Sequence, residues 1–283
     1  MLLLDFLQYL PLAELFAATV FCGVIVGAVV LVSVRLTLRA LKVDPKQVLP
    51  IRESLIGGLT GMFAIMVAFS AAGIWSDDIR AREAVQREAN ALENIVALAS
   101  YLPEKLREEV RNQILLVGRR IIQEDWPAMQ RRTGPNEPLF ERLDTSPIVN
   151  LIDRLSSGAG GSATGPAFDM LIGQLMELRS ARVLREMIAR GGVSHAQWMA
   201  LTLIPIAALT LIVLAYNHDF RWQLTAASIY IVAVCAALFV ILAHDRPFVG
   251  YLGIKPIPIE RAVERIRHGS VSQISGPEGK AAD

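Results

Sequence analysis

The sequence predicts an all-α integral membrane protein with four transmembrane helices and a helical cytosolic domain inserted between spans two and three. Three observations support this prediction. The chain is 53% hydrophobic with 19% charged residues and a mean hydropathy of +0.42. Four apolar runs are long enough to cross a bilayer, and the charged residues gather between the second and third of them. Membrane and aqueous parts are therefore expected to be separate segments.

The four predicted spans cover residues 12–34, 55–75, 197–216 and 222–243. Glu14 lies near the edge of the first span. Pro205 lies in the third, where neighbouring helices can satisfy the freed carbonyl. The start of the chain lacks the basic region and the small-residue cleavage site of a secretory signal, so the first span is expected to be retained.

The predicted organisation has five parts in chain order. These are a first transmembrane helix with a basic loop (1–54), a second transmembrane helix continuing into an aqueous helix (55–102), a helical cytosolic domain (103–196) with a Gly/Ser linker at 156–166, transmembrane helices three and four (197–248), and a C-terminal tail (249–283).

The second span combines small residues with an uninterrupted exit into water. Residues 55–75 carry no charge, and a charged amphipathic segment follows without a proline. Small side chains let helices approach closely, so this helix is expected to pack tightly against copies or neighbours. The small residues are Gly57, Gly58, Gly61, Ala64, Ala68, Ala71, Ala72 and Gly73.

The aqueous region reads as helices because its apolar residues recur at helical spacing. The first helix carries a narrow apolar seam formed by Val85, Ala89, Leu92, Val96 and Ala99. The second follows Pro103, turns one apolar side inward and is expected to end at Trp126-Pro127. Residues 131–147 are predicted to form a loop, and 148–155 a short helix.

The last aqueous helix is predicted over residues 167–190. Its apolar side carries Phe168, Leu171, Leu175 and Leu178. Its basic residues Arg179, Arg182 and Arg185 approach the membrane and are expected to be a solvated, lipid-facing anchor, with an ion funnel as the alternative. In the tail, residues 259–267 are expected to form a basic amphipathic helix on the membrane surface, and 270–283 to be disordered.

The charge pattern indicates an inner-membrane, multi-pass protein with both termini in the cytoplasm. Basic residues near the span ends are more numerous on the side of the termini and the central region. The loop after the first span opposes this orientation, since it carries Arg35, Arg39, Lys42, Lys46 and Arg52.

No motif for catalysis, phosphate binding or metal ligation occurs in the chain, so we expect no enzyme activity, cofactor or metal. Cys22 and Cys235 each lie inside a predicted span and are interpreted as small packing residues. The four histidines are isolated from one another in the sequence, and the net charge of +1 does not favour nucleic acid. The expected partners are membrane lipids, copies of the same chain and small inorganic ions.

Three sequence elements together resemble the bestrophin-like domain proteins of bacteria. They are AFSAAGIWSDDIRAREAVQREANAL from Ala68, EDWP at 124–127 and DRPF at 245–248. The resemblance covers residues 55–263. True bestrophins are oligomeric ion channels with four spans per subunit, a cytosolic helical domain and a pore lined by the second span, where apolar residues spaced by four form a hydrophobic neck.

The resemblance implies neck positions at Gly61, Ile65 and Phe69, with Trp75 as the aromatic residue beyond them. Two departures from the family pattern occur. Glycine cannot narrow a pore at position 61, and Ser70 and Ala71 replace the polar Arg and Asn that follow the neck in bacterial bestrophins. We assign Ser70 and Trp75 to the exit of the second span. The alternative is that Ile65 and Phe69 are ordinary packing residues of a helical bundle.

The membrane-edge motif Asp245, Arg246, Pro247 and Phe248 has a simpler interpretation beside the family one. Arg246 would extend its charge to the interface, Pro247 would end the helix, and Phe248 would anchor at the interface. An ion pair from Asp245 to an arginine near the membrane fits both.

The sequence therefore predicts an oligomeric ion channel with a central pore along the second span. A non-conducting membrane scaffold or signalling protein, whose helical domain binds a cytoplasmic partner, is the alternative from a different class. A transporter is less favoured because no charged residue interrupts spans two to four at mid-membrane.

Overall fold

The structure, a computed structural model, describes residues 11–41, 53–130, 150 and 166–274. All secondary structure among these residues is helical, and four helical segments are long and apolar enough to cross a membrane. The predicted all-α membrane fold is confirmed. The chain divides into two compact units, which are described in turn: unit 1 comprises residues 1–78 and 191–253, and unit 2 comprises residues 79–190 and 254–283.

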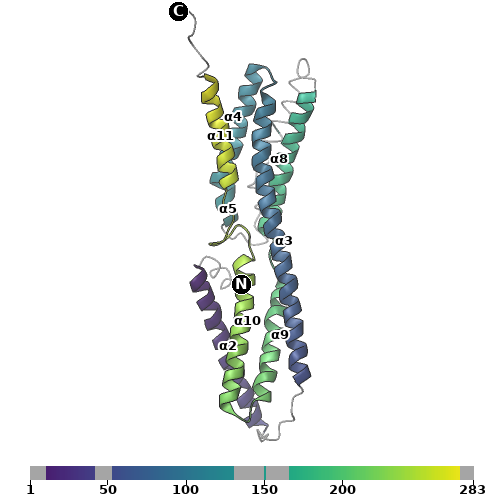
Figure 1. The fold of residues 1–283 in the computed structure, drawn as a ribbon, viewed down its shortest axis with the longest axis vertical. Coiled ribbons are helices and arrows are strands. Elements are labelled where there is room, and N and C mark those ends of the chain that lie inside the picture. The colour runs from purple at the N-terminus through teal and green to yellow at the C-terminus, as the bar shows by residue number, and fades with distance from the viewer. Residues whose placement is uncertain (1–10, 42–52, 131–149, 151–165, 275–283) are drawn as a thin grey trace, which may run out of the picture. The chain divides into compact units, whose positions relative to one another are not determined.

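Unit 1 contains the four predicted spans. They are α2 (Leu12–Ala40), the first part of α3 (Glu53–Ala99), α9 (His195–Ala215) and α10 (Phe220–His244), as Figure 1 shows. A capping box closes the start of α9: the Ser194 side chain accepts from the Gln197 backbone N–H, and the Gln197 side chain accepts from the Ser194 N–H. Asp219 caps α10 by accepting from the Arg221 N–H at 2.9 Å.

Two apolar clusters hold unit 1 together. Val30, Leu209 and Ala227 join α2, α9 and α10 in one cluster. Phe63, Leu201 and Ile241 join α3, α9 and α10 in the other. Helices α2 and α10 approach closely at Gly27, where an added Cβ would lie 2.4 Å from Ile231 Cδ1. A small residue such as Gly27 allows neighbouring spans to approach closely, as is common between membrane helices.

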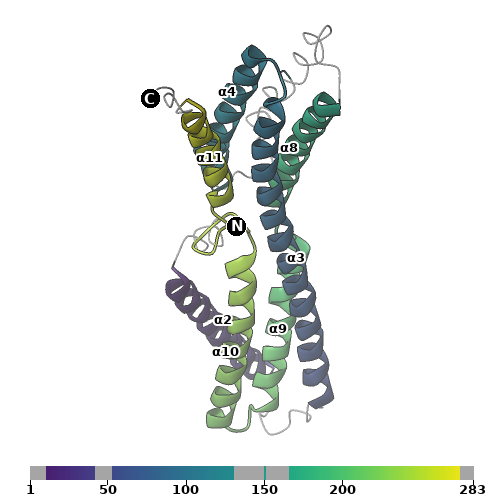
Figure 2. The same cartoon turned by 45° about the horizontal axis from the view of Figure 1, so that its top comes forward.

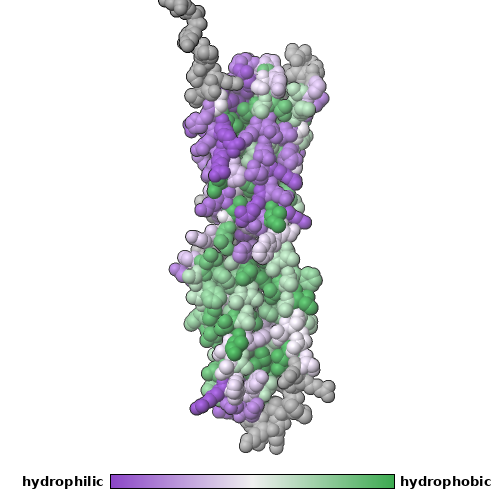
Figure 3. All heavy atoms as spheres, viewed as in Figure 1, coloured by the Kyte–Doolittle hydropathy of each residue, from purple (hydrophilic) through white to green (hydrophobic). Residues whose placement is uncertain are grey.

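The face of unit 1 seen in Figure 3 is largely hydrophobic, as its green colour shows. Large side chains on α2 and α10 point outward, among them Phe21, Val29 and Ile229. Lipid tails are as apolar as these side chains, so their exposure from the protein carries no hydrophobic cost in a membrane. This surface agrees with the predicted membrane location.

Unit 2 is built from the second part of α3, α4 (Glu104–Arg120), the short π-helix η2 (Ile121–Asp125), α5 (Trp126–Gln130), α8 (Pro166–Arg190) and α11 (Ile257–Ile274), seen from a second side in Figure 2. Helix α3 is continuous through Ala99, as predicted. The helix after Pro103 was expected to end at Trp126-Pro127, and this is wrong. It passes through η2 into α5, because Pro127 lies in the first turn of α5, where its missing N–H is tolerated.

The core of unit 2 follows the predicted helical periodicity. Val85, Leu92 and Ala99 of the α3 seam are buried. The inward sides of α4 and α8 are buried as well, through Val110, Ile114 and Val117 and through Leu171, Leu175 and Leu178. Apolar spacing alone therefore identified which helix faces pack together.

Helix α11 corrects the expected tail. Ile259, Ala262 and Ile266 are buried in unit 2, so this helix packs against protein and does not lie on a membrane surface. It packs on α4, where a Cβ added at Gly118 would lie 2.4 Å from Val263 Cγ2. The helix extends to Ile274, into the segment expected to be disordered. The predicted loop (131–147), almost all of the predicted short helix (148–155) and the linker up to residue 165 lie outside the described residues, as do residues 275–283.

Candidate pore-lining face and buried polar network

One face of α3 within unit 1 carries all three predicted neck positions. Gly61, Ile65 and Phe69 follow one another in steps of four, so they line one side of the helix. Ile65 is 57% exposed and Phe69 is 71% exposed. The opposite side is buried through Phe63 and Ile74. Among the described residues, the helix therefore has one side that packs within its own subunit and one side that is largely exposed.

The glycines at the start of this face have open space around them in the described part of the chain. A Cβ added at Gly57, Gly58 or Gly61 would meet no atom within 4 Å. These glycines lie on the same exposed side of α3, nearer its start. The side chains on this face are therefore small at Gly61 and large at Phe69. The surface can line water, pack against a copy of the helix or face lipid.

The two residues assigned to the exit of the span lie on different sides. Ser70 is only 3% exposed and faces the interior of unit 1, where its Oγ has no hydrogen-bond partner among the described residues. Trp75 is exposed and stacks on His244 of α10, with ring centroids 6.4 Å apart and an interplanar angle of 11°. The structure thus separates Ser70 from the face that carries Phe69.

The membrane-edge motif joins the end of α10 to the start of α9. Asp245 Oδ1 accepts a hydrogen bond of 2.6 Å from the Val193 backbone N–H. The preceding residue, Gly192, has a φ of 146°, and a side chain there would press on the Asp245 carboxylate. Phe248 is only 1% exposed, so its ring is buried and is not the interfacial anchor that was expected. Arg246 lies beside a shallow pocket lined by α2 and the segment after α10.

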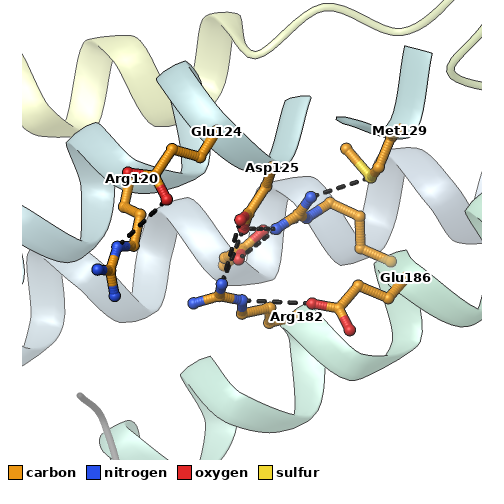
Figure 4. A network of polar contacts seen from close by, with 8 residues as sticks. Arg120, Glu124, Asp125, Met129, Arg182 and Glu186 are labelled. Atoms are coloured by element: carbon orange, nitrogen blue, oxygen red, sulfur yellow. Dashed lines mark hydrogen bonds and ion pairs between the residues drawn. The ribbon is translucent and has the colours of Figure 1, made fainter. Parts of the chain in front are cut away.

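Unit 2 contains a buried network of charged side chains that the sequence did not predict (Figure 4). Arg185 of α8 donates from Nε and Nη2 to the two carboxylate oxygens of Glu88 of α3, at 2.7 and 3.1 Å. Its Nη2 also lies 3.2 Å from Asp125 Oδ2, and its Nη1 lies 3.1 Å from Met129 Sδ. One guanidinium therefore connects α3, η2 and α5 to α8.

A second guanidinium extends the network along α8. Arg182 Nη2 lies 3.0 Å from Asp125 Oδ2, and Arg182 Nε donates to Glu186 Oε1 at 3.3 Å. Asp125 thus accepts from both arginines at the end of η2, where the backbone returns from π to α geometry. Trp126 follows directly, and its ring lies 5.4 Å from the Arg185 guanidinium carbon.

The predicted role of this basic face is corrected. Arg182 and Arg185 are 1% and 0% exposed, so they are neither a solvated, lipid-facing anchor nor the lining of an ion funnel. They can be buried because three carboxylates pair with them. One signal in the sequence pointed to this pairing, since Glu88 falls on the same side of α3 as the apolar seam at Val85 and Leu92.

Burial dominates the electrostatics of the network. It raises the pKa of Asp125, and the neighbouring Arg182 and Arg185 only partly offset this. Burial likewise raises the pKa of Glu186 against the effect of the same two arginines. For Arg185 burial acts in the opposite direction, but the carboxylates of Glu88 and Asp125 overcome it and raise its pKa.

Metal ligation and thiol chemistry concern a few further side chains among the described residues. No group of three or more His, Cys, Asp or Glu side chains among them could hold a metal ion. Cys22 and Cys235 are free thiols, the first exposed and the second buried. The described site is therefore an arrangement of apolar surface and ion pairs.

The chain was compared with known families and structures. A family model described as Bestrophin-like domain matches residues 22–259. Comparison with curated proteins gives no match. The resemblance seen in the sequence is confirmed by the family match, which spans most of the chain.

Solved structures share the fold across almost their full length. One is a bacterial bestrophin homologue from Klebsiella pneumoniae carrying a point mutation, with 13% identity, a TM-score of 0.63, and coverage of 92% of this chain and 99% of that chain. Another structure of the Klebsiella pneumoniae homologue, phased on zinc, has 14% identity, a TM-score of 0.63, and coverage of 90% and 98%. At these identities the likeness concerns the fold.

Proposed function

We propose that this chain, which belongs to the bestrophin-like family, is an oligomeric ion channel that conducts small ions through a central pore lined by α3. Its family and its fold are those of bestrophin-related membrane proteins, which supports a channel and not an enzyme. The finer parts of the proposal are the pore helix, the neck at Ile65 and Phe69, and the assembly of several copies around one axis.

One observation carries the proposal. The side of α3 that bears Gly61, Ile65 and Phe69 is largely exposed in the described part of the chain, while the other side is buried against α9 and α10. A pore-lining helix needs this division, because one side must hold the subunit together and the other must face the axis. Glycines on the exposed side would let the helices of neighbouring subunits come close.

The apolar side chains account for a constriction in the proposed pore. A ring of Phe69 side chains, with Ile65 one turn away, would form a hydrophobic neck that closes by losing its water. At Gly61, one helical turn before Ile65, the pore would be wider because glycine has no side chain. Neither side chain carries a charge, so this neck by itself would not select the sign of the ion.

The proposed location is the inner membrane, with both termini and unit 2 in the cytoplasm. The excess of basic residues on that side of the spans supports this orientation. Accessibility of single cysteines to a membrane-impermeant thiol reagent tests it, with one cysteine placed in the exposed α9–α10 turn and another on the exposed side of α4.

The test of conduction is a current recording in planar bilayers under a potassium chloride gradient. We expect a stable nonzero reversal potential for the purified wild-type protein, and a larger conductance for Phe69→Ala, because the smaller side chain widens the neck. Phe21→Ala is the matched control, since Phe21 is 66% exposed on α2 and lies outside the proposed pore. It should conduct like the wild type.

A contrary result would favour the scaffold interpretation. Silent bilayers from folded, oligomeric wild-type protein would overturn the channel. Equal conductance in Phe69→Ala and Phe21→Ala would leave the channel in place but remove Phe69 from its neck. A monomer in mild detergent would contradict the proposed assembly around a central axis.

A further inference from the structure

We propose that the buried network of unit 2 is a proton-binding site, in which Asp125 and Glu186 together hold one proton that is taken up as the pH falls. The ligand is a hydrogen ion, and its binding stabilises unit 2. The proposal does not depend on ion conduction, since every residue that it uses lies in unit 2.

The count of charges carries the argument. Three carboxylates, those of Glu88, Asp125 and Glu186, share two guanidiniums, those of Arg182 and Arg185. Each of these five side chains is no more than 3% exposed. The fully ionised network therefore has one negative charge in excess. A buried charge without a partner is strongly unfavourable, and a carboxylate relieves this cost by taking up a proton.

The geometry indicates which carboxylates share the proton. Glu88 holds Arg185 through both of its oxygens, at 2.7 and 3.1 Å, which is the strongest arrangement for a carboxylate and a guanidinium. Asp125 divides its contacts between both arginines. Glu186 has a single charged contact in the described network, with Arg182 Nε at 3.3 Å. Asp125 and Glu186, whose contacts with the guanidiniums are divided or single, are thus expected to titrate as a coupled pair.

The electrostatic environment agrees with this assignment. Burial raises the pKa of Asp125 and the pKa of Glu186, and each also feels a second carboxylate, Glu88 or Asp125 respectively. The charged groups that face them come from each packed element: Glu88 from α3, Asp125 from η2, and Arg182, Arg185 and Glu186 from α8. Helix α5 adds the uncharged side chains of Trp126 and Met129.

The sign of the pH effect follows from the raised values. A carboxyl whose pKa is higher in the folded than in the unfolded state binds its proton more tightly when folded. Its contribution to stability is complete below the unfolded pKa and is lost as the pH rises through the folded pKa. Unit 2 is therefore expected to be more stable in mild acid than at neutral pH.

The experiment compares full-length wild-type protein with Glu186→Gln in detergent. Infrared difference spectra between neutral and mildly acidic pH detect the C=O band of a carboxylic acid shielded from water. We expect this band in the wild type and its loss in Glu186→Gln. Glu124→Gln is the matched control, because Glu124 precedes Asp125 but is 66% exposed, and it should keep the band.

Thermal unfolding of the same proteins gives a second readout. The wild type and Glu124→Gln should unfold at higher temperature in mild acid, whereas Glu186→Gln should depend less on pH and be at least as stable as the wild type at neutral pH. Asp125→Asn replaces Glu186→Gln if the latter does not fold. A shielded band that persists in the folded variant, or the same pH dependence in variant and wild type, would overturn the proposal.

Discussion

Units 1 and 2 place their apolar and charged side chains in opposite ways. In unit 1 large apolar rings face outward, with Phe21 66% and Phe69 71% exposed. In unit 2 a group of five charged side chains is buried, with Glu88 and Arg185 both 0% exposed. A membrane solvates apolar groups, so the outward rings need no partner from the chain. A protein interior solvates charges poorly, so each buried charge in unit 2 needs one.

The same difference separates the glycines of the two units. Gly118 of unit 2 lies where α4 and α11 meet, and it leaves no room for a side chain. Gly61 of unit 1 lies on the exposed face of α3 with open space around it. A small residue can therefore mark a contact that exists within the chain or a surface where another chain would pack. Three substitutions test this comparison, beginning with the largest effect.

Glu88→Gln should have the largest effect because it removes one partner of a buried pair. Arg185 would lose its two-bond carboxylate and remain buried, and breaking such a pair costs about 3–5 kcal/mol. Denaturant unfolding monitored by circular dichroism measures the loss. Glu124→Gln, which weakens only the exposed pair with Arg120, should change stability by less than about 1 kcal/mol. Equal effects from both variants would contradict the view that burial makes the network strong.

Gly118→Ala should have the next largest effect. The new Cβ would lie 2.4 Å from Val263 Cγ2, and Val263 is β-branched, so α4 and α11 would have to shift at a cost of about 1–3 kcal/mol. Gly173→Ala on α8 is the control, since its Cβ meets nothing within 4 Å and alanine stabilises a helix by about 0.5–1 kcal/mol relative to glycine. Unfolding of the two variants should shift in opposite directions, and a shared direction would argue against close packing at Gly118.

Gly27→Ala should have the smallest effect of the three. Its Cβ would lie 2.4 Å from Ile231 Cδ1, which is the flexible end of a side chain and can change rotamer. We therefore expect the free energy of unfolding to fall by about 1 kcal/mol, measured by thermal unfolding of the detergent-solubilised protein. Gly61→Ala should leave the packing within the subunit unchanged. If Gly61 faces a neighbouring subunit, Gly61→Ala should alter the oligomeric state seen by size-exclusion chromatography. If neither the stability nor the oligomeric state changes, Gly61 faces lipid or water.

Much of the fold could be predicted because it depends on neighbours in sequence. The apolar runs gave the four spans, and the period of the seam at Val85, Leu92 and Ala99 gave the buried side of α3. The burial of Arg182 and Arg185 could not be predicted in this way. Arg185 and its partner Glu88 are separated by 97 positions, and only their contact in space makes burial of either one favourable.

The candidate site shows the same limit. The spacing of Gly61, Ile65 and Phe69 placed them on one side of a helix, and the sequence alone determined that. The sequence also determined that α3 would leave the membrane without a break, since no proline or glycine follows Gly73 before residue 99. These are properties of one helix and of its solvent.

Only the tertiary structure decided which way each helix faces. It turned Ser70 inward and Phe69 outward, buried the ring of Phe248, and brought α11 onto α4. Periodicity shows which residues share a side, but a side becomes buried only when another helix lies against it. The burial of the charged side chains of unit 2 depends on pairing. A guanidinium is stable in a protein interior only when carboxylates, here partly from other helices, lie within contact of it.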